Sequence, residues 1–443
     1  MHINHPIILN LIHIFKKNIN SSMCKLTPGN LLIILGTGMN FRRFLSIYSV
    51  VFAVLFVSCG ENKNISSIER ENLFTLNYGN FEDEINVYSL LESGSVNTEI
   101  FMQDGFFYIL NGESKKIMEM NSYGNLITLL YNDEENIRPS FAGNDENVSA
   151  TRQAVVYPFN ELTSISVDSR KFLYVADRLP RDRYVYDSES GMALTQVVLR
   201  FDENKKFIDY IGQKGPGGEP FPLINKIYTN ENNELVVFCS TMSSYEIYWY
   251  SVSGFLIHKV EIERNKIPNP YSREMKDSYA SLGNVVCDYE QKKLYLKVDY
   301  YDSKIDESSR VKSGVRYVST LIYPLNVENQ TFDHPISIPP YTEHHSDGLS
   351  NESIDIPYDF LGVTDDQWFY FIVSTDDGFS IQMVQSNGQR ILKRRIPLNR
   401  ADVLYYTFNL SREGIISALL VQKENASITW WRIDSLIQSI LKS

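Results

Sequence analysis

The residues best suited to chemistry in this sequence are a group of arginines and a tyrosine between positions 177 and 184. The group consists of Arg178, Arg181, Arg183 and Tyr184. A planar guanidinium pairs with a carboxylate or phosphate through two parallel hydrogen bonds, so clustered arginines suit an anionic ligand. The same composition also occurs in surface loops whose charges pair with one another. We therefore predict a ligand-binding surface at these four residues, with a salt-bridged loop as the alternative.

Two other segments carry residue types that are found in metal and phosphate sites. Residues 343–347 read Glu-His-His-Ser-Asp. Neighbouring side chains diverge on an extended chain, so two adjacent histidines rarely bind one ion, and we interpret this segment as a solvated loop. Residues 212–218 are rich in glycine but lack the Gly-Lys-Ser/Thr ending of a phosphate-binding loop, and no predicted helix follows them. With no Gly-x-Ser-x-Gly motif either, we assign no catalytic residue, metal ion or cofactor.

The N-terminal region resembles an export signal. Residues 44–57 form an uncharged apolar run that is shorter than the about 20 residues of a membrane-spanning helix, and Arg42 and Arg43 precede it. Ser58 and Cys59 follow the run, and this order resembles the lipobox of bacterial lipoproteins. The resemblance implies that the Cys59 thiol is acylated and that Cys59 becomes the first residue of the mature chain. The alternatives are an uncleaved anchor and a buried cysteine.

This interpretation divides the chain into four parts. We take residues 1–38 as a spurious extension before the initiator Met39, 39–58 as the signal peptide, 59–71 as a polar tether and 72–443 as the folded domain. A rival interpretation makes residues 6–15 or 31–35 a second membrane segment, although both are shorter than a span. The implied location is the bacterial cell envelope, where the lipid makes the membrane a partner.

Charge and composition limit the classes of function. The chain has 42 Lys and Arg against 54 Asp and Glu, a formal charge of -12, so it lacks the basic excess that a general nucleic-acid binder needs. Hydrophobic residues make up 43% and aromatic residues 13%, which favours a folded, strand-rich protein. Cys239 and Cys287 lie in apolar, strand-like segments. They could pair in an oxidising compartment, but we favour two buried free thiols.

A repeated two-strand pattern runs through the rest of the chain. Its first half is a polar turn followed by an apolar strand, with six copies at 104–110, 168–175, 231–238, 288–298, 365–373 and 412–421. Its second half is a pair of strands around a turn, with copies at 120–127, 201–208, 250–257, 325–332 and 384–391. Gly and Asn suit such turns because they adopt positive φ at little cost. Lys205 takes the position that is glycine in the clearest copies.

The repeat predicts an all-β fold, a six-bladed β-propeller of four-stranded antiparallel blades. A single blade cannot bury both of its faces, whereas six blades packed around an axis can. Each unit has about 60 residues, which exceeds a typical blade, and the surplus falls in polar insertions at 135–160, 178–196, 262–283, 302–314 and 333–356. We expect the strand at 72–78 to complete the last blade and close the ring. We also expect Ser435 to cap a short final helix at 436–441.

Residues 199–224 resemble the repeats of NHL-type six-bladed propellers. In that family a strand ends in a Gly-x-x-Gly-x-Gly connection, and a proline precedes the innermost strand of the next blade. The matching residues here are Gly212, Gly215, Gly217, Gly218 and Pro222. The resemblance is clear over residues 100–260 and implies a propeller of the kind found in bacterial lipoproteins.

Three functional hypotheses follow from this resemblance and from the absence of residues at the spacing of a known catalytic motif. The first is a lipid-anchored propeller that binds an unknown small ligand or envelope protein, or acts as a scaffold. The second is a metal-dependent lactonase or lyase, because enzymes of that family gather metal ligands at the central axis. The third is a partner in envelope assembly. Three or more carboxylate or histidine side chains converging on the axis would favour the enzyme, and an axis lined by apolar and amide groups would count against it.

Overall fold

The structure is a computed structural model that describes residues 66–441 except for 95, 143–151, 189–190, 276, 306–310 and 347–350. Cys59, the predicted extension, the signal peptide and most of the tether lie outside the described residues. Within the described part of the chain, no helix is long and apolar enough to cross a membrane.

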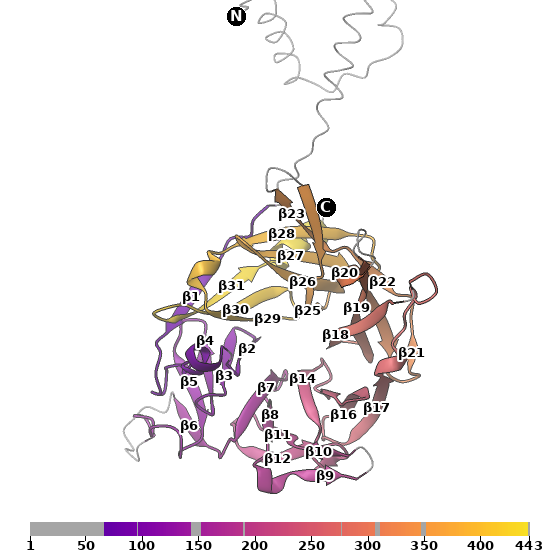
Figure 1. The fold of residues 1–443 in the computed structure, drawn as a ribbon. Helices are drawn as coiled ribbons and strands as arrows, with labels where there is room; N and C mark the ends of the chain where they lie inside the picture. The colour runs from indigo at the N-terminus through magenta and orange to yellow at the C-terminus, as the bar shows by residue number, and fades with distance from the viewer. Residues whose placement is uncertain are drawn as a thin grey trace, which may run out of the picture. The chain divides into compact units, whose positions relative to one another are not determined.

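The described strands form eight sheets; six of them surround a central axis as the blades of a propeller, and the other two are two-stranded hairpins (Figure 1). The innermost strands, one per blade, are β2 (Thr98–Gln103), β7 (Glu161–Val167), β14 (Leu223–Thr229), β18 (Tyr279–Cys287), β25 (Asp359–Val363) and β29 (Tyr405–Leu410). The predicted six-bladed propeller is therefore confirmed. Three blades have five strands instead of the expected four. β6 (Gln153–Val156) pairs in parallel with the edge of blade 1, and β13 (Gly215–Pro216) pairs antiparallel with the edge of blade 2. In blade 4, the third strand pairs with two short outer strands.

The remaining blade strands follow in chain order. Blade 1 continues with β3 (Phe106–Asn111), β4 (Lys116–Asn121) and β5 (Leu126–Tyr131), and blade 2 with β8 (Leu173–Arg178), β11 (Gln196–Phe201) and β12 (Phe207–Gly212). Blade 3 continues with β15 (Leu235–Ser240), β16 (Ser244–Tyr250) and β17 (Leu256–Glu263), and blade 4 with β19 (Lys293–Ile305), β20 (Lys312–Asn326), β21 (Thr331–Phe332) and β22 (Ile336–Ile338). Blade 5 continues with β26 (Trp368–Thr375), β27 (Gly378–Gln385) and β28 (Ile391–Pro397), and blade 6 with β30 (Ile415–Val421) and β31 (Ala426–Arg432).

The first described strand closes the ring, as predicted. β1 (Glu71–Leu76) pairs antiparallel with β31 and forms the outer edge of blade 6. Its Leu76 is 2% exposed and packs into the core between blades 6 and 1. The chain then ends in helix α4 (Asp434–Leu441), two residues longer than predicted. Ser435 lies inside this helix rather than at its cap, and its hydroxyl donates to the Arg432 carbonyl at 3.1 Å.

The alternation of strand direction separates the turns of the propeller into two faces. The six predicted polar turns all connect an innermost strand with the second strand of its blade, and they lie at the end where the innermost strands finish. All five second-half repeats are turns between third and fourth strands, so they lie on the same face, here called the short-turn face. The predicted insertions connect the second strand of a blade with the third, or the last strand of one blade with the innermost strand of the next. They therefore gather on the opposite face, here called the insertion face.

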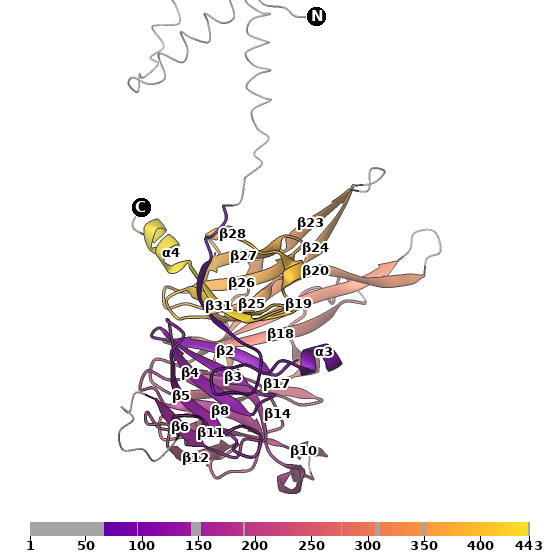
Figure 2. The same ribbon diagram turned by 90° about the vertical axis from the view of Figure 1, so that its left-hand side faces the viewer.

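Four of the five insertions contain strands where we expected polar loops. β6 lies in insertion 135–160, and a short hairpin lies in insertion 178–196. Two longer hairpins come from β19 and β20, which extend over residues 302–305 and 312–314, and from β23 (Tyr341–Ser346) and β24 (Asn351–Ile356) within insertion 333–356. Figure 2 shows these hairpins projecting from one side of the propeller. His344 and His345 lie on β23, so the solvated-loop interpretation was wrong. Because a two-stranded ribbon exposes both faces, its sequence lacks the apolar alternation that marks a blade strand.

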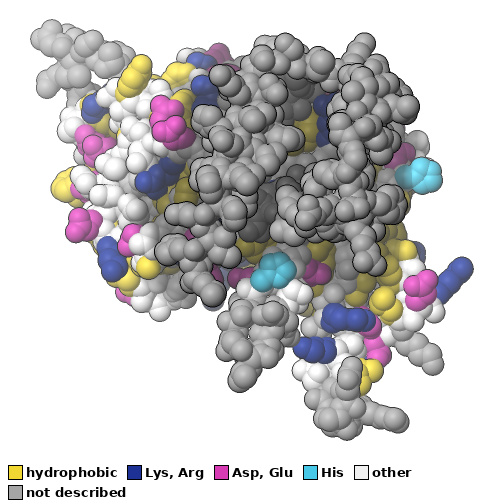
Figure 3. Space-filling model, turned by 90° about the horizontal axis from the view of Figure 1, so that it is seen from above, with side chains coloured by type: hydrophobic (Ala, Val, Ile, Leu, Met, Phe, Trp, Pro, Cys, Tyr) yellow, Lys and Arg dark blue, Asp and Glu magenta, His cyan; other side chains and the backbone are white. Residues whose placement is uncertain are grey.

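Smaller elements complete the insertion face. Helix α3 (Ser89–Ser93) precedes blade 1, and the insertion of blade 2 contains η3 (Arg181–Arg183) and a hairpin of β9 (Val185–Asp187) and β10 (Met192–Leu194). Short helical turns also occur at η4 (Arg264–Lys266) and η5 (Arg400–Asp402). In the view of Figure 3, lysine, arginine and acidic side chains are interspersed on the coloured surface.

The core lies between neighbouring blades, where apolar faces pack against each other. Trp249, for example, is fully buried between blades 3 and 4 with Phe238, Leu282 and Leu296. Cys239 and Cys287 are both buried and free, which confirms the interpretation that we favoured. Burial raises the pKa of both thiols, so both stay protonated and unreactive near neutral pH.

Candidate functional site

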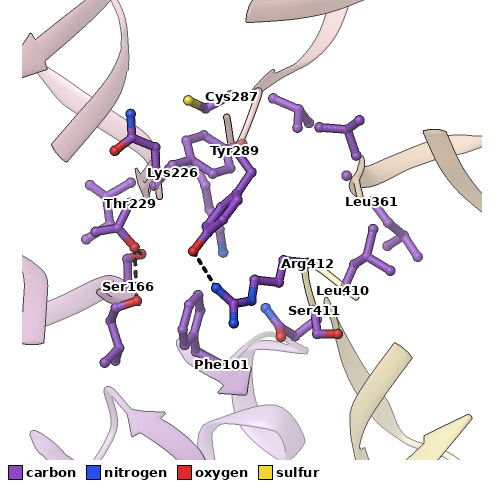
Figure 4. A pocket seen from close by; sticks show the side chains of 18 of the residues that line it. Phe101, Ser166, Lys226, Thr229, Cys287, Tyr289, Leu361, Leu410, Ser411 and Arg412 are labelled. Carbon is purple, nitrogen blue, oxygen red and sulfur yellow. Dashed lines mark hydrogen bonds between the residues drawn. The ribbon is translucent and has the colours of Figure 1, made fainter. Parts of the chain in front are cut away.

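A cavity of about 460 Å³ lies on the central axis toward the short-turn face. All six blades contribute to its wall through the final residues of their innermost strands and the turns that follow (Figure 4). Three wall residues, Asn225, Gly283 and Leu361, sit at β-bulges, where the pairing register of the innermost strand skips one residue. A bulge changes the direction in which a residue faces, which turns the Asn225 and Leu361 side chains and the Gly283 backbone toward the axis.

Amide side chains from four blades line this cavity together with apolar groups. The amides are Gln103, Asn225, Asn230, Asn284 and Asn409. Asn409 accepts a hydrogen bond from the Met102 backbone at 3.1 Å, and Asn284 donates to the Phe360 carbonyl at 3.0 Å. The Asn225 side chain is exposed to the cavity and forms no hydrogen bond within the described part of the structure. Phe101, Leu361 and Leu410 supply the apolar part of the wall (Figure 4).

The lysine in the wall is already paired. Lys226 on β14 contacts Glu99 on β2 at 2.6 Å, which is a contact across the axis between blades 3 and 1. The second carboxylate oxygen of Glu99 accepts from the Ile165 backbone at 3.2 Å and from Ser164 at 3.4 Å. Glu99 thus joins three blades, and the pair adds no net charge to the cavity.

Arg412 crosses the mouth of the cavity from the turn after β29. Its Nη1 donates to the Tyr289 hydroxyl at 2.8 Å, so a side chain of blade 6 meets a side chain of blade 4 (Figure 4). Its Nε donates to Glu413 at 2.5 Å. Burial raises the pKa of nearby Asp365 to about 6, an effect that the charge of Arg412 opposes. One oxygen of Asp365 is buried without a hydrogen-bond partner in the described residues, which leaves an acceptor beside the mouth.

The residues around the axis do not fit the metal centre of the enzyme hypothesis. Asp168 is the one carboxylate among the described residues of the cavity wall. Its Oδ2 accepts hydrogen bonds from Arg170 Nε at 3.0 Å and Arg170 Nη2 at 2.5 Å. Across the described ranges, no three His, Cys, Asp or Glu side chains are grouped closely enough to hold a metal ion. Divalent cations need several such ligands, so we derive no metal-dependent step. The wall combines amide, hydroxyl and apolar groups with the paired charges of Asp168, Lys226 and Arg412, so it is not the purely apolar and amide axis that we expected to count against the enzyme.

The predicted arginine cluster lies away from this cavity. Arg178 ends β8, and its Nη1 donates to both carboxylate oxygens of Glu161, at 2.9 and 3.1 Å. Arg181 and Arg183 are exposed on η3, and Tyr184 packs partly against the core between blades 1 and 2. Ligand binding at these residues stays a prediction. The cavity residues were missed because they come from six segments that are far apart in sequence, although the six polar turns mark the ends of the strands that carry them.

Comparisons with known proteins do not assign this chain to a family. No family model and no curated protein matches it. Among solved structures, the polysaccharide lyase Uly1 is similar at 7% identity and a TM-score of 0.38, covering 84% of this chain and 95% of that one. A gluconolactonase from Xanthomonas campestris is similar at 10% identity and a TM-score of 0.37, covering 83% of this chain and 96% of that one. At these values the similarities carry no argument about activity, and the fold assignment depends on the strand pairing described above.

Proposed function

We propose that this protein is a lipid-anchored propeller of the bacterial cell envelope that binds a small polar ligand in its central cavity. The observation that carries the proposal is the cavity wall, to which six blades contribute amide, hydroxyl and apolar groups. A mainly preformed concave site with a few convergent polar groups is the usual form of a small-molecule site. Binding is preferred to the lactonase or lyase hypothesis because the axial side chains do not form a metal site.

The wall favours a ligand without net charge. Both cations in the wall have partners, since Lys226 is paired with Glu99 and Arg412 with Glu413. A charged ligand would have to break these pairs and leave a partly buried charge alone, which is costly. Amides can donate and accept hydrogen bonds, and this matches hydroxyl and amide groups of a ligand. A sugar or a small peptide has this chemistry.

The cavity part of the proposal is tested by filling the site. Asn225→Trp places a large side chain on the axis, and Asn232→Trp is the matched control because Asn232 is exposed on the turn after the same strand. In saturation-transfer NMR with mono- and disaccharides and dipeptides, we expect at least one compound to bind the wild type and the control but not Asn225→Trp. Equal binding by both variants, or no binding at all, would contradict the proposal.

The anchor part of the proposal is tested separately at Cys59. Cells fed an alkyne fatty acid are expected to label the wild-type protein and leave Cys59→Ala unlabelled, because the thiol is the expected acylation site. The variant should also leave the membrane fraction. Cys239→Ala serves as a control, since that thiol is buried in the propeller and should not affect labelling. A label that persists on Cys59→Ala would refute the lipid anchor without affecting the cavity.

A further inference from the structure

The outer part of blade 5 carries a run of cations without acids between them. From Gly378 to Ala401, which covers β27 and β28, the chain contains five Lys or Arg residues and no Asp or Glu. The chain as a whole has a formal charge of -12, so this stretch is the reverse of the average composition. A strongly basic stretch in an acidic protein indicates a surface that contacts anions.

Three of these cations contact no carboxylate among the described residues. Arg390 is exposed on the turn that precedes β28. Arg394 donates from Nη1 to the Lys393 carbonyl at 2.8 Å. Lys393 is half-buried, and burial lowers the pKa of its ammonium group, so its surroundings do not compensate the charge. We call Arg390, Lys393 and Arg394 the basic edge.

The other two cations already have partners in the propeller. Arg395 contacts the carboxylate of Asp377. Arg400 lies over the rings of Phe379 and Tyr406, at 5.5 and 5.4 Å from their centroids. The charge that is left for a ligand is therefore that of the basic edge.

The basic edge lies on the rim of the propeller. β28 is the outermost strand of blade 5, and no described strand pairs with its outer side. Side chains alternate along a strand, so Lys393 and Arg394 leave opposite faces of the sheet. Both can reach beyond the rim because no further strand covers them. From Arg390 to Arg394 the chain spans about 14 Å, which gives room for more than one anion.

The segment that leads to Cys59 joins the propeller at the same strand. Ser67 forms a parallel bridge with Arg395, and the Ile68 amide donates to the Arg395 carbonyl at 2.9 Å. The Arg395 amide in turn donates to the Ser66 carbonyl at 3.2 Å. Figure 2 shows the indigo start of the described chain beside β28. Because the bridge is parallel, Ser66 lies on the side of Arg394 and the rest of the basic edge.

The distance from Cys59 to this strand is short. Seven residues separate Cys59 from Ser66, and they span at most about 25 Å when fully extended. A lipid on Cys59 would therefore keep β28 close to the membrane surface at all times.

We propose that the basic edge binds the anionic phospholipid headgroups of the membrane that holds the anchor, and so fixes which side of the propeller faces that membrane. This inference rests on the anchor part of the proposed function. Headgroup phosphates accept hydrogen bonds from guanidinium and ammonium groups. An acidic polymer has the same charge, but a tether that ends at this strand gives the membrane a much higher effective concentration.

The basic edge adds to the anchor and does not replace it. Each Lys or Arg contributes only a small attraction to an anionic membrane, so three give weak binding without a lipid. Cys59→Ala is therefore still expected to leave the membrane fraction. Contact at the rim also leaves the central cavity accessible, because the cavity is lined by β25 at the other side of the blade.

The test measures how close the rim comes to the membrane by fluorescence quenching. Full-length protein purified from membranes is placed on vesicles of phosphatidylcholine, with or without about 30% phosphatidylglycerol, that carry a nitroxide on a few headgroups. One dye is attached at Ile391→Cys, which is 41% exposed on β28. The control dye is attached at Ile208→Cys, which is 45% exposed on the fourth strand of the opposite blade 2. The chain without an introduced cysteine gives the background.

We expect phosphatidylglycerol to increase quenching at Ile391→Cys by about twofold or more, and high salt to remove the increase. Quenching at Ile208→Cys should not change. The double variant Lys393→Gln, Arg394→Gln should lose the increase. Its matched control, Lys206→Gln, Lys214→Gln, removes the same charge from exposed positions of blade 2 and should keep it. Lys393→Arg, Arg394→Lys retains both charges and should also keep it, which excludes a folding defect as the cause.

Two readouts separate the failure of this inference from the failure of the anchor. Flotation with phosphatidylcholine vesicles reports the anchor alone, and a chain that does not float would remove the anchor and this inference together. A chain that floats but is quenched equally on both kinds of vesicle overturns the basic edge and leaves the anchor intact. An equal increase at Ile208→Cys, or equal behaviour of the two Gln variants, overturns it as well. If polygalacturonate shields the Ile391→Cys dye while phosphatidylglycerol has no effect, the edge binds an acidic polymer instead.

Discussion

A chain that begins at residue 79 is expected to lose its cooperative fold, whereas a chain that begins at residue 66 should keep it. The difference between the two is β1, the strand that closes the ring on β31. Without β1, the backbone groups of β31 lose their partners and form an open sheet edge, which promotes aggregation. The shorter chain also loses the Phe74 ring, which meets Phe107 of blade 1 edge-on at 5.8 Å.

The expected effect is large compared with the stability of a domain. Leu76 alone is buried in the core between blades 6 and 1, and removing such a side chain to alanine typically costs about 2–5 kcal/mol. Loss of the whole strand adds the hydrogen bonds and the Trp430–Glu71 contact at 2.6 Å. Domain stabilities are about 5–15 kcal/mol, so the sum is enough to unfold the protein.

Thermal unfolding by circular dichroism and size-exclusion chromatography check this prediction. The chain from 66 is the matched control, since it lacks the same upstream residues but keeps β1. We expect one cooperative transition and a monomer-sized peak for the control, and aggregation or a broad transition for the chain from 79. Equal melting temperatures for the two chains would mean that the ring does not depend on this closure.

Lys205→Met is expected to lower the free energy of unfolding by about 3–5 kcal/mol. Lys205 lies on the turn between β11 and β12 in blade 2 and is 2% exposed. Its ammonium reaches Glu119 of blade 1 at 3.4 Å and donates to the Lys171 carbonyl at 3.2 Å. Glu119 is 5% exposed and otherwise accepts only from the Tyr108 hydroxyl, at 3.0 Å, among the described contacts. Methionine keeps the side-chain volume but leaves this carboxylate buried without its cation.

A double-mutant cycle isolates the pair. Glu119→Gln removes the charge, so the Lys205→Met, Glu119→Gln variant should be more stable than the sum of the two single losses predicts. Lys206→Met is the matched control, because Lys206 is exposed and its loss should change stability by no more than about 0.5 kcal/mol. Denaturant unfolding provides the free energies. A Lys205→Met variant as stable as Lys206→Met would show that the buried pair contributes nothing to blade packing.

The repeats could be recognised from the sequence because short turns between paired strands restrict the backbone conformation, and so the residue types, at the turn positions. The turn residues Lys171, Asn233 and Gln367 have positive φ, and so does Lys205. Such positions favour glycine or asparagine, so Asn233 fits the preference, whereas Lys171, Gln367 and Lys205 depart from it. The recurrence of polar turns followed by apolar strands revealed the blades. At Lys205 the gain is tertiary, since its side chain reaches a carboxylate on another blade.

The insertions were only partly readable. Their positions were correct, but the strand extensions at 302–305 and 312–314 and the pairing of β23 with β24 were not predicted. A ribbon that is solvated on both faces needs no apolar alternation, so its residues resemble those of a loop.

The sequence by itself determined the number of blades, the strand that closes the ring and the terminal helix. Each of these depends on neighbours along the chain or on a repeated local pattern. Tertiary structure alone decided the cavity. Its side chains come from strands that are far apart in sequence, and Asn225 and Leu361 face the axis because the innermost strands bulge there. Ring closure brings these strands together, and no local pattern records which residues then share a wall.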